Sequence, residues 1–439
     1  MSFFVKFTRM PDGDQIVKKI FKLNYDKLKS VIIIGGGIIG LCSAYYLAKE
    51  GVQVTVIDKS DMADGCSYGN AGMIVPSHII PMAQPGVIHQ GIKWMFNAKS
   101  PFYIKPALSL DLLSWLIQFY KNSNQNHVDK SMVPLRNLSF FSKELYQEFA
   151  QSANEFGYQE KGLLMLYNTE KVGEEEVKIG KIAEELGIDV DFLDQQEVKE
   201  LEKNIAVNAL GAVHYKTDAH LSPNHFISFL KAELNEMGVK MISNCSVIDF
   251  KSSDGKIAEL ITNKGDFKAD EFVISAGSWS VEVAKKLGVK LHILSGKGYS
   301  FNVENLMVKP TVPTILCEGK VAVTPLGETV RFGGTLEITN NNDTKINIKR
   351  LEGIVEKVNQ FYPDIKVGLP DKEKVWLGFR PCTPTGLPII EKSKKIKNLT
   401  IATGHAMMGL SLAPASGKLV SELILGKKTS VDITEFRRC

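Results

Sequence analysis

The sequence predicts an α/β fold in which a nucleotide-binding domain is assembled from three segments and interrupted by an α+β domain built on an antiparallel sheet. Three observations predict it. A strand–helix–strand pattern follows residue 30, α/β patterns return in the middle and at the end of the chain, and residues 297–334 alternate like antiparallel strands. Because strands that are separated along the chain can share one sheet, we expect the three α/β stretches to form one domain.

The elements are expected in a definite order. The opening unit is a strand at 31–34, a helix at 38–50 and a strand at 53–58. Helical periodicity predicts helices near 110–121, 136–156, 174–186, 196–203, 346–361 and 414–425, with a further helix capped by Ser222. Short apolar runs predict strands at 163–167, 239–243, 247–251, 257–262, 272–275, 375–379 and 399–403. Between 76 and 106, Pro and Gly punctuate an aromatic-rich stretch without a regular pattern.

This order divides the chain into six expected segments. The nucleotide-binding domain takes residues 31–78, 210–290 and 372–439, and the second domain takes residues 79–209 and 291–371. Residues 1–30 are expected to form a basic leader, in which apolar side chains stand among lysines. Such a leader is either a solvated helix or a helix that lies on a membrane surface, and both interpretations stay open.

Composition narrows the class of function. The chain has 439 residues, with 53 Lys and Arg against 49 Asp and Glu, so its net charge is +4. No dense Lys/Arg block of the kind that tracks a phosphate backbone is present, and we expect no nucleic-acid partner. The six cysteines are scattered without a CxxC pair or a His cluster, which predicts no metal site, no disulfide framework and a reducing, cytoplasmic location.

A glycine-rich turn between the first strand and the first helix predicts a dinucleotide site. Gly35, Gly37 and Gly40 form a GxGxxG motif, which allows a tight turn, close approach of a pyrophosphate, and close packing of helix on strand. The N–H groups at the start of the helix then face the phosphates. Asp58 ends the second strand, where an acid accepts hydrogen bonds from the adenosine ribose hydroxyls.

Further small-residue segments favour FAD over NAD, although the motif serves both. The loop 65–73, the turn 275–279 and the segment 403–409 are small enough to border a flavin dinucleotide, and a helix N-terminus after the last would stabilise negative charge on a reduced flavin. The residues expected to contact the cofactor are Gly35, Gly37, Ile38, Ile39, Gly40, Asp58, Lys59, Ser67, Asn70, Ala71, Gly72, Met73, Val247, Ala276, Gly277, Trp279, Gly404, Met408, Gly409 and Leu410.

Together these residues resemble the D-amino-acid oxidase/glycine oxidase superfamily of FAD enzymes, over roughly residues 31–426. Within it the chain is most similar to the FAD subunit of D-amino-acid dehydrogenase and to hydroxyproline dehydrogenases. The most specific match is the run GFRPCTPTGLP at 378–388, supported by the runs at 70–72, 297–300 and 333–337. The run at 218–223 is more like hydroxyproline dehydrogenases, so the substrate stays open. The resemblance implies a Rossmann-like FAD-binding domain with an interleaved substrate domain.

The resemblance also implies an amino-acid substrate whose carboxylate is bound by Arg380, since a guanidinium can grip a carboxylate through two parallel hydrogen bonds. Tyr299 and His405 are the other candidate catalytic residues. Tyr299 is either a second carboxylate ligand or a core tyrosine, and His405 is either a neighbour of the flavin or a turn histidine. Sarcosine-oxidase-like relatives attach the flavin through a cysteine two positions before the arginine. Gly378 stands there in this chain, so we expect non-covalent FAD.

The reaction that the resemblance implies is hydride transfer from the substrate Cα to flavin N5, which leaves an imino acid that water hydrolyses. The expected substrate is a D-amino acid, with D-proline and hydroxy-D-proline among the candidates, and the expected acceptor is a quinone or a carrier protein. Three alternatives stay open: an oxidase of glycine, sarcosine or a D-amino acid that produces hydrogen peroxide, a flavin-holding non-catalytic subunit, and an NAD-dependent hydroxyacid dehydrogenase.

An apolar stretch between Trp94 and Phe119 is richer in aromatic residues than an average core helix. It forms either ordinary core or an exposed face that meets a membrane or a quinone. A peripheral contact with the inner face of the plasma membrane therefore stays open.

Overall fold

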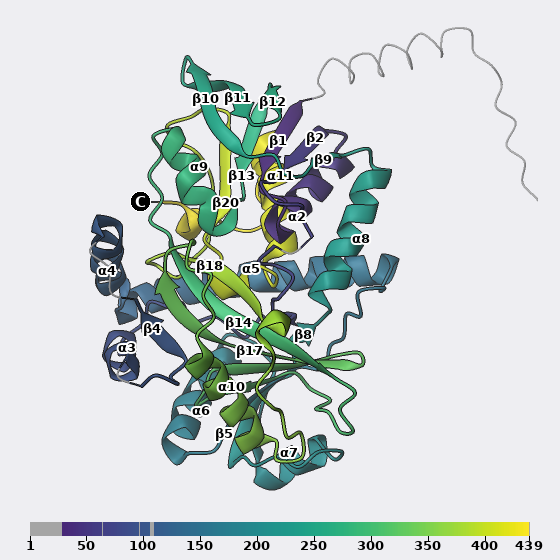
Figure 1. Cartoon of the computed structure of the whole chain (residues 1–439), viewed down its shortest axis with the longest axis vertical. Coiled ribbons are helices and arrows are strands. Elements are labelled where there is room, and N and C mark those ends of the chain that lie inside the picture. The colour runs from purple at the N-terminus through teal and green to yellow at the C-terminus, as the bar shows by residue number, and fades with distance from the viewer. Residues whose placement is uncertain (1–28, 64, 96, 106–108, 439) are drawn as a thin grey trace, which may run out of the picture.

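The computed structural model describes residues 29–63, 65–95, 97–105 and 109–438. The expected basic leader lies outside the described residues, except for its last two positions. Two domains lie one above the other along the long axis of the molecule, and each is built around its own sheet (Figure 1).

The upper domain contains a six-stranded sheet whose strands come from three stretches of sequence. Its order is β19-β20-β13-β1-β2-β9, and all neighbours are parallel except β19 and β20. The strands are β1 (Ser30–Ile34), β2 (Gln53–Ile57), β9 (Lys240–Ile242), β13 (Glu271–Ile274), β19 (Ile389–Lys392) and β20 (Leu399–Thr403). The prediction of one domain assembled from three segments is therefore confirmed.

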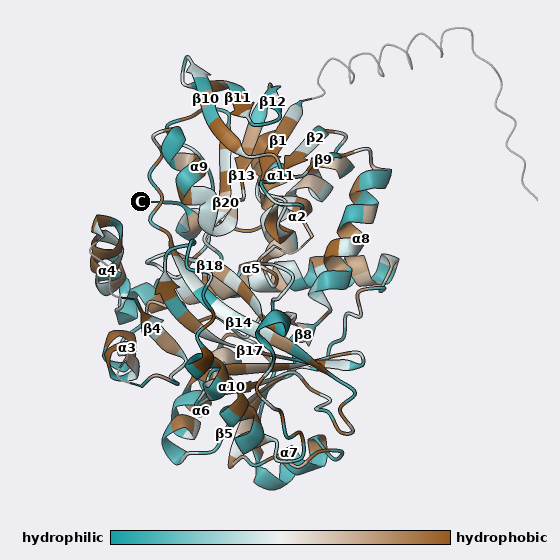
Figure 2. Ribbon diagram, in the orientation of Figure 1, coloured by the Kyte–Doolittle hydropathy of each residue, from teal (hydrophilic) through white to brown (hydrophobic). Residues whose placement is uncertain are grey.

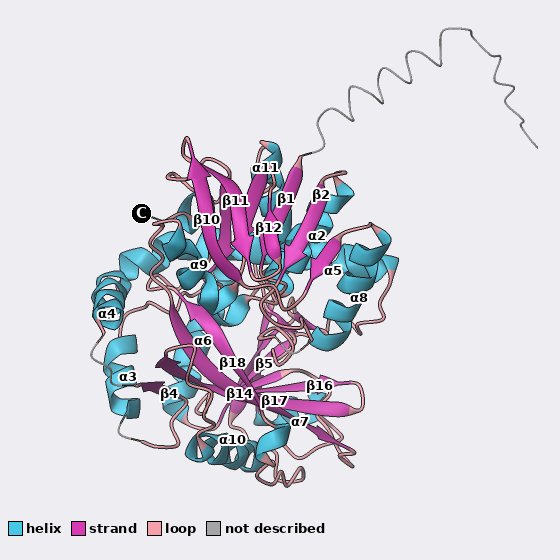
Figure 3. Ribbon diagram, turned by 45° about the horizontal axis from the view of Figure 1, so that its top comes forward, coloured by secondary structure: helices cyan, strands magenta, loops and turns pink. Residues whose placement is uncertain are grey.

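Both faces of this sheet are covered, as expected for parallel strands that are apolar throughout. Val31 and Ile33 of β1 face a core shared with four helices, whereas Ile32 and Ile34 face a second core on the other side. The first core packs against α2 (Ile38–Lys49), α5 (Gln125–Ser152), α8 (Pro223–Glu236) and α11 (Ala413–Leu425). The second packs against α9 (Ser280–Lys286) and a small sheet of β10 (Val247–Ser253), β11 (Lys256–Thr262) and β12 (Gly265–Phe267). Figure 3 shows the strands of the upper domain fanned side by side, with α2 and α11 behind them.

The lower domain is built on a nine-stranded, mostly antiparallel sheet, as predicted. Its order is β18-β14-β17-β16-β15-β5-β7-β6, with β4 paired to β17. The strands are β4 (Phe102–Ile104), β5 (Leu163–Tyr167), β6 (Val190–Asp194), β7 (Gly211–Tyr215), β14 (Leu294–Glu304), β15 (Thr314–Leu316), β16 (Val321–Leu326), β17 (Thr329–Thr339) and β18 (Trp376–Cys382). Its helices are α3 (Val87–Met95), α4 (Leu110–Asn122), α6 (Glu170–Glu185), α7 (Gln195–Leu201) and α10 (Ile348–Phe361).

Short elements connect these parts. A two-stranded sheet pairs β3 (Met73–Ile74) with β8 (Ala219–His220). Four 3-10 turns complete the described elements: η1 (Gly277–Trp279), η2 (Lys372–Lys374), η3 (Ala406–Met408) and η4 (Thr434–Phe436). The residues that η1 and η3 bring to the middle of the molecule matter for the site described below.

Strand pairing corrects the expected place of two strands. Residues 211–215 and 376–382 fall in segments expected to join the nucleotide-binding domain, but β7 pairs with β5 and β6, and β18 pairs with β14. A short apolar strand does not specify from its own sequence which edge it will hydrogen-bond, so the choice depended on distant partners. The other expected domain boundaries stay predictions.

The predicted first residue of α5 was also wrong. The periodic pattern predicted a helix from 136, but α5 begins at Gln125, where the Asn124 side chain accepts a hydrogen bond from the His127 N–H. Pro134 lies inside the helix and interrupts the pattern without ending it. The resulting helix crosses between the two domains (Figure 1).

Candidate active site

The turn between β1 and α2 has the close packing that a GxGxxG motif requires. Gly35 has φ +117°, a conformation that favours glycine. A Cβ at Gly40 would lie 1.9 Å from the carbonyl oxygen of Gly35, so no larger residue fits between the turn and the helix. The Ile38 N–H at the start of α2 donates to the Ser67 hydroxyl at 3.1 Å. Ser67 therefore ties the loop 65–73 to the start of α2.

Asp58 closes β2 beside this turn, as the sequence predicted. One carboxylate oxygen, Oδ2, accepts from the Gly36 N–H at 2.7 Å, and Oδ1 accepts from the N–H and the hydroxyl of Ser60. A carboxylate has about four acceptor positions, so it retains capacity for ribose hydroxyls. The neighbouring Lys59 ammonium lies 3.7 Å from the ring centroid of Trp279, which closes that edge with a cation–π contact.

A cavity of about 2050 Å³ runs from this turn into the lower domain. Because single small-molecule pockets usually measure roughly 300–1,000 Å³, the space can hold more than one small ligand. Of the residues expected to contact the cofactor, those in its wall are Gly35, Gly37, Ile38, Ile39, Asp58, Lys59, Ser67, Asn70, Ala71, Met73, Val247, Ala276, Gly277, Trp279, Met408, Gly409 and Leu410.

The three remaining glycines do not line the cavity. Gly40 is the packing residue behind the first turn. Gly72 has φ +83°, and a Cβ there would lie 2.4 Å from the Leu221 carbonyl oxygen. Gly404 has φ +79°, and its Cβ would lie 2.6 Å from a methyl carbon of Thr383. These glycines shape the wall through the backbone.

Two residues that no sequence motif indicated hold the loop 65–73 against the lower domain. Nη1 of Arg331, in β17, donates to the carbonyl oxygens of Tyr68 and Asn70 at 2.9 and 2.6 Å. The Ser300 hydroxyl, in β14, donates to the Gly69 carbonyl. Burial lowers the pKa of Arg331 to about 10, so it remains a cation at neutral pH. A charged residue between two buried strand residues was the signal that could have identified it.

The segment between β20 and α11 is fixed in the same manner. The hydroxyl groups of Tyr146 and Ser142, both in α5, donate to the carbonyl oxygens of Leu410 and Ser411 at 2.6 Å each. The Val75 N–H donates to the Ser411 hydroxyl. The wall formed by residues 408–412 is therefore held by α5 and by the chain after β3.

Arg380, in β18, lines the cavity. Nη1 donates to the Thr335 carbonyl oxygen, and desolvation by burial lowers the pKa of the guanidinium from its ordinary value. Gly298 on the adjacent strand makes room for it, since a Cβ there would lie 2.2 Å from Nη1. Thr335 has φ +64°, which is strained for a β-branched residue. The Thr335 backbone is thus strained at the residue whose carbonyl oxygen accepts from Arg380.

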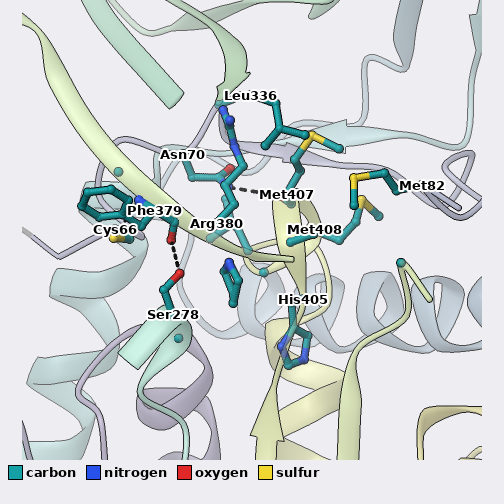
Figure 4. Close-up of a pocket in the computed structure, with 18 of the residues that line it drawn as sticks. Cys66, Asn70, Met82, Ser278, Leu336, Phe379, Arg380, His405, Met407 and Met408 are labelled. Carbon is teal, nitrogen blue, oxygen red and sulfur yellow. Dashed lines mark hydrogen bonds between the residues drawn. The ribbon is translucent and has the colours of Figure 1, made fainter. Parts of the chain in front are cut away.

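The surroundings of Arg380 are mainly apolar. Figure 4 shows Leu336, Met407 and Met408 around Arg380, with Asn70 on the same side. A small apolar region next to a single guanidinium is suited to a molecule that carries a carboxylate and an uncharged side chain.

His405 does not point at Arg380. Its ring points towards α11 (Figure 4), where Nε2 lies 2.8 Å from the Ser416 hydroxyl. Burial lowers the pKa of His405 to about 3, so the ring is neutral at physiological pH. The arrangement matches the turn histidine that was the alternative for this residue.

Tyr299 faces the other side of the sheet from Arg380. Its hydroxyl donates to the Glu337 carboxylate and accepts from the Asn347 N–H at 3.1 Å, and its ring packs in the core under α10. Side chains alternate along a strand, so Gly298 next to it faces Arg380. These contacts favour the core tyrosine, which was the alternative role for this residue.

Asp218 forms a buried network near the cavity. Its two carboxylate oxygens accept from the N–H and the hydroxyl of Ser77, and the Ser77 hydroxyl lies 3.2 Å from Nδ1 of His78. Burial raises the pKa of Asp218 to about 7. Burial also lowers the pKa of His78, which lines the cavity, to about 4. The network holds the chain after β3 against β8.

The cavity fits FAD at one end and a smaller molecule at the other. The turn at Gly35, the acid at Asp58 and the wall at 276–279 lie at the nucleotide end, whereas Arg380 lies where β18 faces η3. Within the described residues, no group of three or more His, Cys, Asp and Glu could hold a metal ion.

Comparisons with known proteins agree with this geometry. A family model described as FAD dependent oxidoreductase matches residues 30–423. The chain is 31% identical over 397 residues to a D-amino acid dehydrogenase of Helicobacter pylori, covering 90% of this chain and 94% of the relative. It is 31% identical to the D-amino acid dehydrogenase of Vibrio atlanticus, covering 91% and 97%.

The fold is similar to that of a solved glycine oxidase from Geobacillus kaustophilus. The TM-score is 0.75 with 23% sequence identity, and the alignment covers 93% of this chain and 98% of the oxidase. At this identity the likeness concerns the fold. The family model spans nearly the whole described chain, and the cavity has the features that an FAD site requires. The chain therefore belongs to the FAD dependent oxidoreductase family.

Proposed function

We propose that the protein is a dehydrogenase that oxidises a D-amino acid to the corresponding imino acid, which water hydrolyses to a 2-oxo acid and ammonia. The observation that carries the proposal is the buried guanidinium of Arg380, fixed by the Thr335 carbonyl and surrounded by apolar side chains. The D-amino acid dehydrogenases of Helicobacter pylori and Vibrio atlanticus support the choice of substrate class.

The chain's own residues bind and orient the substrate. Arg380 binds the carboxylate, and its remaining N–H donors are sufficient for two parallel hydrogen bonds. The apolar wall at Leu336, Met407 and Met408 lies beside the substrate side chain and the Cα. FAD held non-covalently at this site would supply the two-electron chemistry, as the acceptor of the hydride from Cα. His405 is neutral and bonded to Ser416, so we propose that the amine enters deprotonated and needs no side-chain base.

The proposed cofactor contacts follow the cavity wall. The N–H groups of the turn at Gly37 and the start of α2 would bind the pyrophosphate, Asp58 would bind the ribose, and the segment 408–410 would border the flavin ring. D-Proline and hydroxy-D-proline are included among the substrates to test, because their Cα–H bond can also give up a hydride. The product is then a cyclic imine, whose hydrolysis releases no ammonia.

The proposed acceptor is a quinone or a carrier protein. One arm of the cavity runs under α3 and α4, and its wall is mainly apolar, with Gln84 and Gln90 as polar members. The apolar members are Val87, Ile88, Ile92, Trp94, Met95, Phe102, Ile104, Trp115, Leu116 and Phe119. An apolar acceptor could enter there, and a contact with the inner face of the plasma membrane would supply it. Within the described residues, no helix combines the length and apolar character needed to cross a bilayer.

The test is anaerobic flavin reduction by a panel of D-amino acids, with L-proline, sarcosine and glycine included. We expect the wild type to bleach with D-amino acids and Arg380→Met to keep its yellow colour but lose kcat/KM by about 10²–10⁴-fold, the loss of a charged bidentate contact. Arg437→Met, a change at an exposed arginine, is the matched control. Bleaching only by L-proline, sarcosine or glycine would contradict the substrate class, and peroxide formed in step with turnover would favour an oxidase.

A further inference from the structure

Helix α4 carries an apolar stripe that faces away from the protein. The exposed fractions of its members are 85% for Leu110, 56% for Leu113, 48% for Ile117 and 72% for Tyr120. Steps of three and four residues place these side chains on one face of a helix. Figure 2 shows α4 and α3 side by side at the edge of the molecule, beyond the end of the lower sheet.

The opposite face of α4 is firmly anchored, so the stripe is a fixed feature of the surface. Trp115 and Phe119 are buried and stacked, with ring centroids 4.8 Å apart. Trp115 Nε1 donates to the Cys382 carbonyl oxygen at 2.9 Å, in the same strand as Arg380. The Ser109 side chain caps the start of the helix. Because these contacts fix the orientation of α4, the apolar stripe on its other face stays exposed.

The stripe is continuous with the cavity that contains Arg380. Tyr120 of α4 and Ile92 of α3 are both exposed, Ile92 to 55%, and both line the cavity. Between them, Leu116 and Phe119 line the cavity from the inner side of α4. The apolar arm therefore reaches the surface at the stripe.

The charges around the stripe are mainly positive. Lys93 in α3 and Lys121 in α4 are exposed, and Asp111 is the one acidic residue within α3, β4 and α4. Lys290 and Asp111 both lie close enough to His292 to affect its pKa, Lys290 by lowering it and Asp111 by raising it. An apolar stripe flanked by lysines matches a bilayer with anionic headgroups.

We propose that α3 and α4 form a docking surface for an anionic lipid bilayer, with Leu110, Leu113, Ile117 and Tyr120 inserted among the headgroups. In this position the apolar arm of the cavity opens toward the membrane, which is the route that the proposed quinone acceptor requires. The acceptor route rests on the proposed function, but the docking surface does not. A second copy fits less well, since an isologous contact sets the same patch against itself and would place two lysine-flanked patches face to face.

The experiment is flotation of the full chain with bound FAD on vesicles of phosphatidylglycerol and phosphatidylcholine, compared with phosphatidylcholine alone. We expect the wild type to float with the anionic vesicles, and salt to weaken the binding. The double variant Leu113→Gln/Ile117→Gln, whose residues do not line the cavity, should bind at least about tenfold more weakly. Leu210→Gln/Leu369→Gln is the matched control, because these residues are similarly exposed, at 48% and 49%, but lie outside α3 and α4.

Three outcomes would overturn the docking surface: a wild type that stays with the unbound protein, a double variant that floats like the wild type, and a control that binds as weakly as the double variant. A dimer in lipid-free buffer that Leu113→Gln/Ile117→Gln dissociates would identify a second copy as the occupant instead. Oxidation of amino acids with a water-soluble dye as acceptor should be equal in wild type and double variant. If neither protein oxidises amino acids, the proposed function is contradicted. The vesicle result still decides on the docking surface in that case.

Discussion

A Cβ at residue 298 would lie 2.2 Å from Nη1 of Arg380, so Gly298 and the guanidinium occupy adjoining space on neighbouring strands. The contact explains why the resemblance extends to both the run at 297–300 and the run at 378–388, which are far apart in the sequence. Because Gly298 on β14 has no side chain, Arg380 on β18 has room to reach the cavity.

Gly298→Ala is therefore expected to displace Arg380. Because a shift of about 1 Å in a positioning group can cost roughly 10²-fold in rate, we expect kcat/KM for the amino acid to fall by about that factor while FAD stays bound. Steady-state kinetics and the flavin spectrum measure the two effects separately. Gly368→Ala is the control, because no atom lies within 4 Å of its Cβ position. Unchanged kinetics in Gly298→Ala would show that Arg380 does not bind the substrate from this position.

Tyr299→Phe is expected to change stability more than catalysis. Its hydroxyl donates to Glu337, and its loss leaves that buried carboxylate short of a donor. The free energy of unfolding should fall by about 1–3 kcal/mol, and kcat/KM should change less than about threefold. Tyr362→Phe, which removes a buried hydroxyl that donates to Thr314, should give the same pattern. A large loss of kcat/KM in Tyr299→Phe alone would restore the catalytic role that the sequence suggested.

Asp218→Asn is expected to stabilise the protein more at pH 8 than at pH 5. The folded-state pKa of Asp218, about 7, lies above its ordinary value of 3.8, so the folded chain binds the extra proton between these values. The contribution of Asp218 is thus fully present below pH 4 and is lost as the pH rises through 7. Asparagine removes this dependence, and the difference between the two pH values should be on the order of 2–3 kcal/mol. Denaturant unfolding at both values measures it, with exposed Asp129→Asn as the control. Equal effects at both values would mean that Asp218 is ionised in the folded protein.

Removal of FAD is expected to destabilise the protein, since the ligand binds the folded state alone. With FAD at 100 times its Kd, the free energy of unfolding should rise by about 2.7 kcal/mol over the apoprotein. Asp58→Asn weakens an acceptor next to the turn at Gly36 and should raise the Kd for FAD by about 10–100-fold. Titration of apoprotein with FAD measures both. Asp61→Asn, three residues on and outside the cavity wall, should bind FAD like the wild type.

The sequence predicted the parts of the site that depend on local backbone geometry. Gly35 needs a positive φ, Gly40 needs contact with the Gly35 carbonyl, and Asp58 needs the end of the next strand. These requirements act within a few residues and recur in a fixed pattern, so a single sequence displays them. Arg380 was found through a longer run of matching residues, because no local rule distinguishes it from a surface arginine.

The sequence did not reveal the contacts that join distant elements. Arg331 binds carbonyl groups of residues more than 260 positions away, and the hydroxyl of Tyr299 is bound by a carboxylate 38 positions away. The local sequence of residues 211–215 and 376–382 does not show which sheet they join. The first strand pairs with β5 and the second with β14. Each of these outcomes depends on which surfaces meet after the chain has folded.

By itself the sequence determined the dinucleotide turn and the α/β plan in three segments, because glycine geometry and hydrophobic periodicity depend on neighbouring residues. The candidate arginine came from the resemblance of a longer run of residues. Only the tertiary structure decided that Tyr299 faces a core glutamate, that His405 is neutral against Ser416, and that α4 turns an apolar stripe outward beside the cavity. The physical reason is that burial, pKa and exposure are properties of surroundings, and the surroundings of a side chain are supplied by residues far away in the chain.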